Sequence, residues 1–314
     1  MARCFVSRPL IGSALERLAA EHETDVWPHD DAPPSGEEIR ERAREAEGLL
    51  VQHAKVDVGL LDACPDLRVV SNFGVGLDNV DVEACTARGI LVGNTPDVLT
   101  DTTADMAFAL LLAAARRVPE ADAVVREGRW GEWVFNGLLG AEVSGATLGL
   151  VGFGEIARAV ARRGEGFGME VLHFRRSGGG VTFEELLERS DFVSLHVPLT
   201  PSTRHLIDEA ALRRMRDSAI LVNTARGAVI DQGALERALR EGWIAGAAID
   251  VTDPEPLPAD HPLLAAPNLI VAPHIGSGTR RTRERMADLA VDNLLAGLAG
   301  RAMPSCANPG ARPV

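Results

Sequence analysis

The sequence predicts an α/β protein with parallel β-sheets in two domains. Short apolar runs rich in Val, Ile and Leu alternate with helical patterns, as in strands that are joined by crossover helices. The chain has 314 residues, 46% of them hydrophobic, which suffices for a large core and exceeds what one compact core usually holds. No internal repeat or low-complexity tract interrupts the alternation.

Nine apolar runs are candidate strands. They span residues 4–7, 48–51, 68–72, 147–152, 170–174, 192–196, 219–223, 246–250 and 269–272. Glycines or polar turn residues follow most of them. Ligands of parallel sheets bind beyond the carboxyl ends of the strands, so functional residues are expected directly after these runs.

Two helical stretches are candidate connections between the domains. Residues 100–118 open with Thr-Asp after Thr-Pro-Asp, which is a helix start signal, and residues 280–298 form the last helical pattern of the chain.

The overall charge argues against two classes of partner. The chain carries 32 Lys and Arg against 45 Asp and Glu, a formal net charge of -13, and such a surface repels nucleic acids and anionic membranes. The start, MARCFVSRPL, lacks the pattern of a signal peptide, and the longest apolar run, residues 106–115, is too short to cross a bilayer. We expect a soluble, cytoplasmic protein without nucleic-acid or membrane partners.

Four cysteines are scattered along the chain, at Cys4, Cys64, Cys85 and Cys306. Their spacing matches neither a metal site nor a redox motif, so we expect buried, reduced thiols and no metal.

The strongest local motif is LGLVGFGEIA at residues 148–157, where an apolar strand leads into Gly152-x-Gly154-x-x-Ala157 and a helix. Glycines allow a tight turn whose N–H groups approach a pyrophosphate at the helix N-terminus. The alternative is a tight turn without a ligand. The context of strand, turn, helix and second strand favours dinucleotide binding by the residues of the turn, which are Gly152, Phe153, Gly154, Glu155 and Ile156.

The end of the next predicted strand indicates which dinucleotide binds. An NAD enzyme usually places an acid there for the ribose 2′-hydroxyl, whereas this chain reads Arg175-Arg176-Ser177. Two guanidiniums and a hydroxyl suit a 2′-phosphate, although solvated loop arginines are the alternative. We expect NADP(H) to be preferred, with NAD(H) as the other candidate.

Three ionisable residues follow predicted strands: Arg226 in NTARG, Glu255 in DPEP and His274 in PHIGS. Each alone could be a surface charge, a loop carboxylate or a hydrogen-bonded histidine. Together they provide what reduction of a ketone by hydride requires, a fixed cation to orient a carboxylate and polarise the carbonyl, and an acid to protonate the alkoxide. Arg226 would be the clamp and His274 the acid, with Glu255 as its partner.

These residues resemble a known family, the D-isomer-specific 2-hydroxyacid dehydrogenases, and within it the glyoxylate and hydroxypyruvate reductases. The resemblance covers nearly the whole chain. It is carried by Gly74-Val75-Gly76-Leu77-Asp78-Asn79-Val80-Asp81, TPDVLTDTTAD at residues 95–105, the glycine motif, NTARG, and DVTDPEPLPADHPLL through PHIGSGT.

The resemblance implies a fold of two doubly wound, Rossmann-like parallel-sheet domains. The NAD(P)-binding domain, residues 97–286, is inserted into a substrate-binding domain of residues 1–96 and 287–314. It also implies reduction of a small 2-keto acid to the D-2-hydroxy acid, with Arg226 as the clamp and His274 and Glu255 as the proton-donating pair.

Further site residues follow from the resemblance alone. The amides of Val75 and Gly76 would hold the substrate carboxylate. Trp130 and Trp133 look like tryptophans that lie near the partner subunit's active site, which implies a homodimer and a substrate contact for Trp133. The alternative for two tryptophans three positions apart is packing in the core or at the dimer interface. The remaining cofactor-binding residues would be Thr103, His196, Pro198, Thr203, Thr224, Ala225, Asp250, Gly276 and Ser277.

The chain departs from the family pattern in two places. Only Ser177-Gly178-Gly179-Gly180 separates Arg176 from Val181, which is short and puts the NADP(H) preference in doubt. Ala157 replaces the commoner third glycine, which the motif tolerates. The alternatives are a phenylpyruvate- or phosphoglycerate-type dehydrogenase and a nucleotide-sensing, co-repressor-like binding protein, and the sequence does not decide which keto acid is the substrate.

Overall fold

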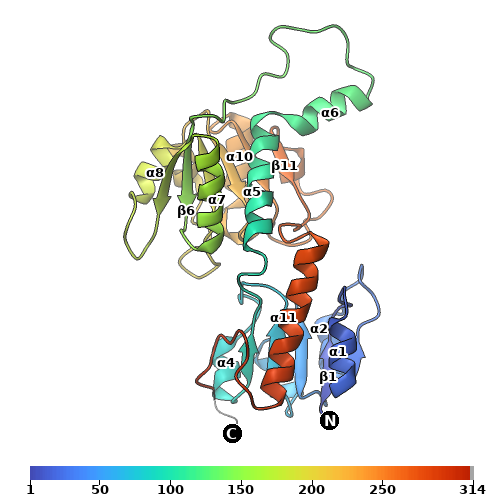
Figure 1. Ribbon diagram of the computed structural model, residues 1–314. Helices are drawn as coiled ribbons and strands as arrows, with labels where there is room; N and C mark the ends of the chain where they lie inside the picture. Colours follow the sequence, from blue (N-terminus) through green and yellow to red (C-terminus); the bar gives the residue numbers. More distant parts are fainter. Residues whose placement is uncertain (312–314) are drawn as a thin grey trace. The chain divides into compact units, whose positions relative to one another are not determined.

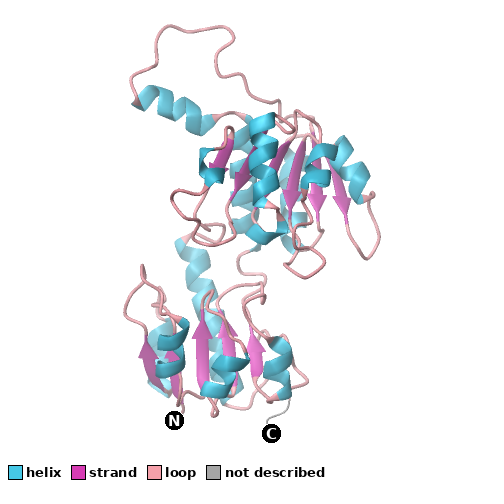
Figure 2. Ribbon diagram, turned by 180° about the vertical axis from the view of Figure 1, so that it is seen from behind, coloured by secondary structure: helices cyan, strands magenta, loops and turns pink. Residues whose placement is uncertain are grey.

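The computed structural model describes residues 1–311, and the chain divides into two compact units (Figures 1 and 2). Unit 1 comprises Met1–Leu99 and Gly278–Val314, and unit 2, Thr100–Ser277, is inserted between these segments. The sequence placed the boundaries at 96/97 and 286/287. The two units meet at 99/100 and 277/278 instead. The second boundary moves further because position 286 falls inside one continuous helix, α11 (Arg280–Leu298), which belongs to unit 1.

Unit 1 is a five-stranded parallel sheet in the order β2-β1-β3-β4-β5. Its other elements in chain order are β1 (Arg3–Val6), α1 (Ala14–Glu21), β2 (Glu23–Val26), α2 (Gly36–Arg42), β3 (Gly48–Val51), α3 (Val58–Ala63), β4 (Val69–Asn72), α4 (Val82–Ala87) and β5 (Leu91–Gly93). The order reverses between β1 and β3, which marks the carboxyl edge near these strands as the ligand-binding edge of the sheet.

Helices cover both faces of this sheet. Ile39 of α2, Leu60 of α3 and Cys85 of α4 are buried against one face. On the other face α11 packs on β3 and β4, where glycines permit a close approach. A Cβ added to Gly297 would lie 2.8 Å from Val69 Cγ2, which is closer than such atoms can pack.

Unit 2 is a six-stranded parallel sheet in the order β11-β10-β9-β8-β6-β7. Its elements are α5 (Thr100–Ala115), α6 (Val118–Arg126), β6 (Thr147–Val151), α7 (Glu155–Gly166), β7 (Glu170–Phe174), α8 (Phe183–Arg189), β8 (Phe192–Leu195), α9 (Glu209–Arg214), β9 (Ile220–Asn223), α10 (Gln232–Glu241), β10 (Gly246–Ile249) and β11 (Leu269–Val271), with short 3-10 turns at Gly227–Val229 and Pro262–Ala265.

Two apolar cores lie on the two faces of the unit 2 sheet. Ala104 and Leu111 of α5 pack with Val160 of α7 on one face, and Leu186 of α8 packs with Leu235 of α10 on the other. The strand order reverses between β6 and β8, so their carboxyl ends form the binding edge. Both units are therefore doubly wound parallel sheets, which confirms the predicted fold class.

All nine predicted strands are present, and two further strands were missed. β2 reads Glu-Thr-Asp-Val at an edge of its sheet and is only half buried, so it gives no apolar run. β5, Leu-Val-Gly, has only three residues. The helix predicted over 100–118 ends at Ala115, because Arg117 adopts a left-handed conformation with φ of 53° and α6 begins after it.

Within residues 1–311, no helix is long and apolar enough to cross a membrane. Cys4, Cys64 and Cys85 are buried, and burial raises the pKa of the Cys4 thiol to about 12 and those of Cys64 and Cys85 to about 11. Cys306 is only partly buried, in contrast to the expectation for all four.

Candidate active site

The glycine motif forms a turn at the carboxyl end of β6, where it leads into α7. Gly152 has φ of 89°, and a Cβ there would lie 2.5 Å from the carbonyl oxygen of His196, so this position requires glycine. Gly154 is the N-cap of α7, and the space around its missing Cβ is open. The first N–H groups of α7, from Glu155 and Ile156 onward, have no partner within the helix and can bind an anion.

Phe153 fixes this turn to the neighbouring strand. Its ring stacks on that of His173 in β7, with centroids 4.0 Å apart and planes 17° apart, and the Arg158 guanidinium lies 5.8 Å from the Phe153 centroid. The backbone between the two glycines is therefore held in place before any ligand binds.

The loop after β7 carries Arg175, Arg176 and Ser177, all exposed. Arg176 Nη2 donates a hydrogen bond of 2.9 Å to the carbonyl oxygen of Ser202, and Nη1 donates to the Ser202 hydroxyl. Gly178, Gly179 and Gly180 all have positive φ, so three glycines complete the short connection. No acid occupies the end of β7, and the two guanidiniums suit a phosphate.

The loop after β8 holds the predicted residues His196, Pro198 and Thr203. The His196 side chain is partly buried, and its Nε2 lies 2.9 Å from the Ser194 hydroxyl. Burial lowers the pKa of His196 to about 4, so the ring is neutral near pH 7. Thr203 Oγ1 donates to the Pro198 carbonyl over 2.6 Å and fixes the shape of the loop.

Thr224, which with Ala225 follows β9, supports the presence of a bound group. Within the described residues its buried hydroxyl has no hydrogen-bond partner. A buried hydroxyl without a partner is unfavourable, and a polar ligand would satisfy it. This hydroxyl, the open space at Gly154 and the amides of α7 fit a dinucleotide along the carboxyl edge of unit 2.

Asp250, at the end of β10, organises the turn after β11. Its carboxylate accepts hydrogen bonds from the N–H of Ile275 at 2.8 Å and of Gly276 at 2.6 Å, and its carbonyl accepts from His274 N at 2.8 Å. Burial raises the pKa of the Asp250 carboxyl above its ordinary value, while the two amides oppose that rise. A Cβ on Gly276 would lie 3.5 Å from Thr103 Cγ2, so the start of α5 packs against the same turn. The turn continues to Ser277.

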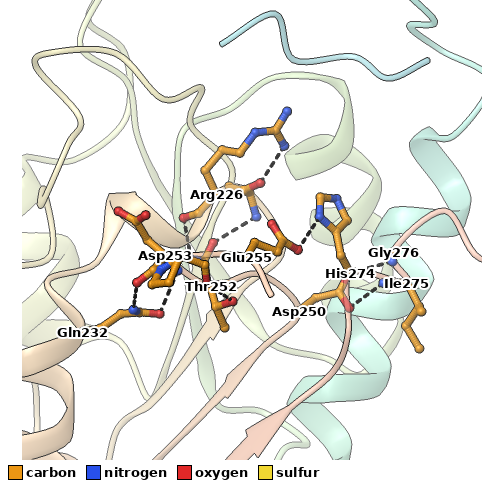
Figure 3. Close-up of polar contacts among 12 residues, drawn as sticks. Arg226, Gln232, Asp250, Thr252, Asp253, Glu255, His274, Ile275 and Gly276 are labelled. Atoms are coloured by element: carbon orange, nitrogen blue, oxygen red, sulfur yellow. Dashed lines mark hydrogen bonds and ion pairs between the residues drawn. The ribbon is translucent and has the colours of Figure 1, made fainter. Parts of the chain in front are cut away.

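His274 and Glu255 form the pair that the sequence predicted. His274 Nδ1 lies 2.7 Å from Glu255 Oε1, and the two side chains point toward one another in Figure 3. The His274 side chain is 27% exposed and that of Glu255 is 36% exposed, so a substrate can reach them. His274 has φ of 55°, a left-handed conformation that the Asp250 contacts stabilise.

Arg226 lies on the turn after β9, beside the loop that carries Glu255 (Figure 3). Asn223 holds this turn, because its amide donates to the Arg226 carbonyl at 2.8 Å and accepts from Ala225 N at 2.9 Å. A Cβ on Gly227 would lie 2.0 Å from the Thr252 carbonyl carbon. Only glycine permits this approach, which brings the Arg226 and Glu255 loops together.

Sequence reasoning missed two residues that hold these loops, Asn223 and Gln232. Gln232, at the start of α10, donates to the Asp253 carbonyl and accepts from Asp253 N at 3.1 Å. Asn223 stood in the NTARG motif and could have been noticed there, whereas nothing in the sequence links Gln232 to Asp253.

Two of the predicted substrate contacts lie elsewhere in the chain. Val75 and Gly76 follow β4 at the carboxyl edge of unit 1, where the Val75 residue is 38% exposed. The structure describes the two units separately, so it does not join these residues to Arg226, Glu255 or His274.

Trp130 and Trp133 belong to the segment between α6 and β6, which runs away from the sheet of unit 2 in Figure 1. They are 74% and 81% exposed. The returning end of this segment, residues 139–141, lines a cavity of about 520 Å³ with residues that precede β9, β10 and β11. The end of this segment therefore lies at the amino ends of these strands, opposite the edge of the sheet that carries His274.

Comparison with known proteins shows the family to which the chain is similar. The NAD-binding domain of the D-isomer specific 2-hydroxyacid dehydrogenases matches residues 108–276. Glyoxylate reductase of Korarchaeum cryptofilum is 50% identical, over 98% of this chain and 96% of the relative, and that of Thermococcus litoralis is 45% identical over the same shares.

Solved structures are similar over the whole chain. A protein from Thermus thermophilus has a TM-score of 0.92 and 47% identity, over 97% of this chain and 99% of the other. The NADPH-dependent glyoxylate/hydroxypyruvate reductase of Sinorhizobium meliloti, in complex with NADP and malonate, has a TM-score of 0.85 and 36% identity, over 99% and 98%.

Proposed function

Because the chain belongs to the D-isomer specific 2-hydroxyacid dehydrogenase family, we propose that it reduces glyoxylate and hydroxypyruvate, to glycolate and D-glycerate, with NADPH. Membership makes the protein an NAD(P)-dependent dehydrogenase. The observation that carries the proposal is the His274–Glu255 contact of 2.7 Å on the carboxyl edge of the sheet, with Arg226 on the neighbouring turn.

Two side chains, His274 and Glu255, supply the proton in the proposed reaction. When bound, the reduced dinucleotide supplies the hydride that the carbonyl carbon takes up. The carbonyl oxygen takes its proton from Nε2 of His274, because Nδ1 is held by Glu255. Glu255 fixes the orientation of the ring and balances the charge of the imidazolium.

Arg226 is the proposed electrophile. Its guanidinium is planar and permanently charged, so it can bind a carboxylate oxygen and polarise the adjacent carbonyl. Asn223 and Gly227 keep its backbone in one conformation, which reduces the cost of orienting the guanidinium for the reaction.

The loop after β7 is the proposed determinant of cofactor preference. Arg175, Arg176 and Ser177 would contact the 2′-phosphate of NADP(H), and the absence of an acid there removes the usual partner of the NAD ribose. The contacts of Arg176 with Ser202 support this role, because they restrain one of the two guanidiniums. NAD(H) would bind the same edge without this contribution.

We assign binding of the substrate carboxylate to the amides of Val75 and Gly76 in unit 1. We also propose a homodimer in which Trp133 contacts the substrate of the partner subunit. Trp133, Phe135 and Val134 are 81%, 78% and 66% exposed, which is costly for large apolar side chains unless a second copy covers them. Sedimentation of the intact protein tests the dimer, and a monomer at micromolar concentration would refute it.

The proposal is tested by initial rates of NADPH and NADH oxidation with glyoxylate, hydroxypyruvate, pyruvate and phenylpyruvate as acceptors. We expect the fastest turnover with NADPH and the first two acids. Preference for phenylpyruvate would indicate another dehydrogenase of the family. Tight dinucleotide binding without turnover of any acid would indicate a nucleotide-sensing protein.

A further inference from the structure

The turn Gly74-Val75-Gly76 in unit 1 has all three of its carbonyl oxygens occupied. The Gly74 oxygen accepts from Thr95 N at 2.9 Å, and the Gly76 oxygen accepts from Asn72 Nδ2 at 2.8 Å. The Val75 oxygen accepts from the side chain of Asn94, whose Nδ2 lies 2.9 Å away. Each peptide of the turn is therefore fixed by a donor from another part of unit 1.

Fixing these carbonyls also fixes the amides. In a trans peptide, the N–H of one residue points away from the C=O of the residue before it. The hydrogen bond from Thr95 N to the Gly74 oxygen therefore points the Val75 N–H away from Thr95. The hydrogen bond from Asn94 Nδ2 to the Val75 oxygen points the Gly76 N–H away from Asn94. Consecutive N–H groups presented in this way form a concave site for an anion.

Asn94 is itself held by the C-terminal part of the chain. Its Oδ1 accepts from Ser305 Oγ at 2.7 Å, which determines that Nδ2 is the atom that faces Val75. Asn293, fully buried on α11, donates to the Asn94 carbonyl at 3.0 Å and accepts from Ser305 N at 2.9 Å. A continuous chain of hydrogen bonds runs from Ser305 through Asn94 to the turn.

We propose that Asn94 is a positioning residue for the substrate carboxylate, and that Ser305 acts through it. The inference rests on the proposed function, in which the amides of Val75 and Gly76 bind that carboxylate. Without the Asn94 donor, the Val75–Gly76 peptide can rotate, and the Gly76 N–H no longer holds one direction. The affinity for the keto acid decreases, whereas the affinity for the dinucleotide does not, because the dinucleotide site lies in unit 2.

The test compares four variants of the intact protein. Asn94→Ala removes the donor, and Asn94→Asp keeps the shape but cannot donate to the Val75 oxygen. Ser305→Ala removes only the contact that orients Asn94. Asn308→Ala is the matched control, because Asn308 ties the same C-terminal segment to Val92 N at 2.8 Å without contacting Asn94.

We expect the KM for glyoxylate to rise about 10- to 100-fold in both Asn94 variants, because the Gly76 N–H then loses its hydrogen bond to the charged substrate carboxylate. In Ser305→Ala the KM should rise by a smaller factor. The KM for NADPH stays unchanged. The control loses thermal stability and keeps its KM for glyoxylate. Equal KM values in wild type and Asn94→Ala, or the same increase in the control, would overturn the inference.

A binding measurement separates this inference from the proposed function. Calorimetric titration of the NADPH-loaded protein with oxamate, a carboxylate that cannot be reduced as a keto acid, should show weaker binding in Asn94→Ala than in wild type. If wild type binds oxamate but reduces no keto acid, the proposed function fails while the role of Asn94 is still tested. Equal oxamate affinity in the two proteins would refute that role, and so would the absence of oxamate binding by wild type.

Discussion

The turns that follow β9, β10 and β11 differ sharply from the loop that follows β7, although all lie on the carboxyl edge of one sheet. Around Arg226 and His274 the backbone is held by buried side chains, Asn223 and Asp250 among them. The loop after β7 is exposed, and its Arg176 side chain is tied to Ser202 at the surface of unit 2. Under the proposed function, the chemistry takes place on turns that buried side chains hold, while the choice of cofactor depends on an exposed loop.

Among substitutions outside the His274–Glu255 pair, the largest effect is expected for Arg226→Ala. Loss of a preorganised electrostatic contact to the reacting carbonyl should reduce kcat/KM for glyoxylate by about 100- to 1,000-fold. Arg226→Lys is the matched control, since it keeps the charge but loses the planar fork, and it should recover only part of the activity. The affinity of the variant for NADPH, measured by fluorescence titration, should be nearly that of wild type. A loss of NADPH binding as large as the loss of turnover would place Arg226 at the cofactor instead.

The next effect concerns the β7 loop alone. Arg175→Asp combined with Arg176→Ala should lower the ratio of kcat/KM for NADPH to that for NADH by about 10- to 100-fold, because charge-assisted contacts to the 2′-phosphate are lost. The kcat with saturating NADH should stay close to that of wild type. Ser202→Ala, which only releases Arg176, should shift the same ratio less. An unchanged ratio in the double variant would show that the loop does not read the phosphate.

A smaller effect is expected for Gln232→Ala, which tests the rigidity of the catalytic edge at a distance from the substrate. The variant removes both contacts with Asp253, so the loop of Glu255 should become less ordered, and kcat should fall several-fold with little change in the KM for NADPH. Arg237→Ala, on the same helix but bonded to Glu209, is the control and should keep the wild-type kcat. Equal kcat values in the two variants would contradict a role for Gln232.

The smallest effect at neutral pH is expected at the end of β8, which lies between the two regions in the sheet. His196 titrates near 4 in the folded protein against 6.5 for the free side chain, so below pH 6.5 the unfolded chain binds the proton more strongly. The free energy of unfolding therefore decreases as the pH falls from 6.5 to 4, and His196 accounts for up to about 3 kcal/mol of that decrease. His196→Gln should flatten that part of the curve of unfolding free energy against pH. An equally steep curve in the variant would contradict a neutral His196 in the folded protein at pH 6.

The parts of the molecule that the sequence predicted have strong local patterns. The buried strands of both sheets are runs of aliphatic residues, and the glycine turn and the NTARG and PHIGS turns follow such runs directly. β2 was missed because an edge strand with two acids carries no apolar signal, and α5 was extended too far because nothing in the sequence shows that Arg117 adopts a left-handed backbone.

The supporting contacts could not be predicted, because they join residues that are distant in sequence. Gln232 and Asp253 are 21 positions apart, and Asn94 and Ser305 are 211 apart. Their types are common in turns and on helix surfaces, so only the folded chain identifies their partners. His274 and Glu255 were paired on chemical grounds, and the contact of 2.7 Å bears out their proximity while their roles stay a proposal.

The most direct measurement is glyoxylate-dependent oxidation of NADPH by wild type and His274→Asn, made alongside NADPH titrations of both proteins. Asparagine keeps a polar side chain near Glu255 but cannot act as an acid, so we expect NADPH to bind both proteins equally and kcat to fall by about 100- to 10,000-fold in the variant. Turnover by His274→Asn at the wild-type rate would show that the proton comes from another group, and would contradict the proposed role of the His274–Glu255 pair as proton donor.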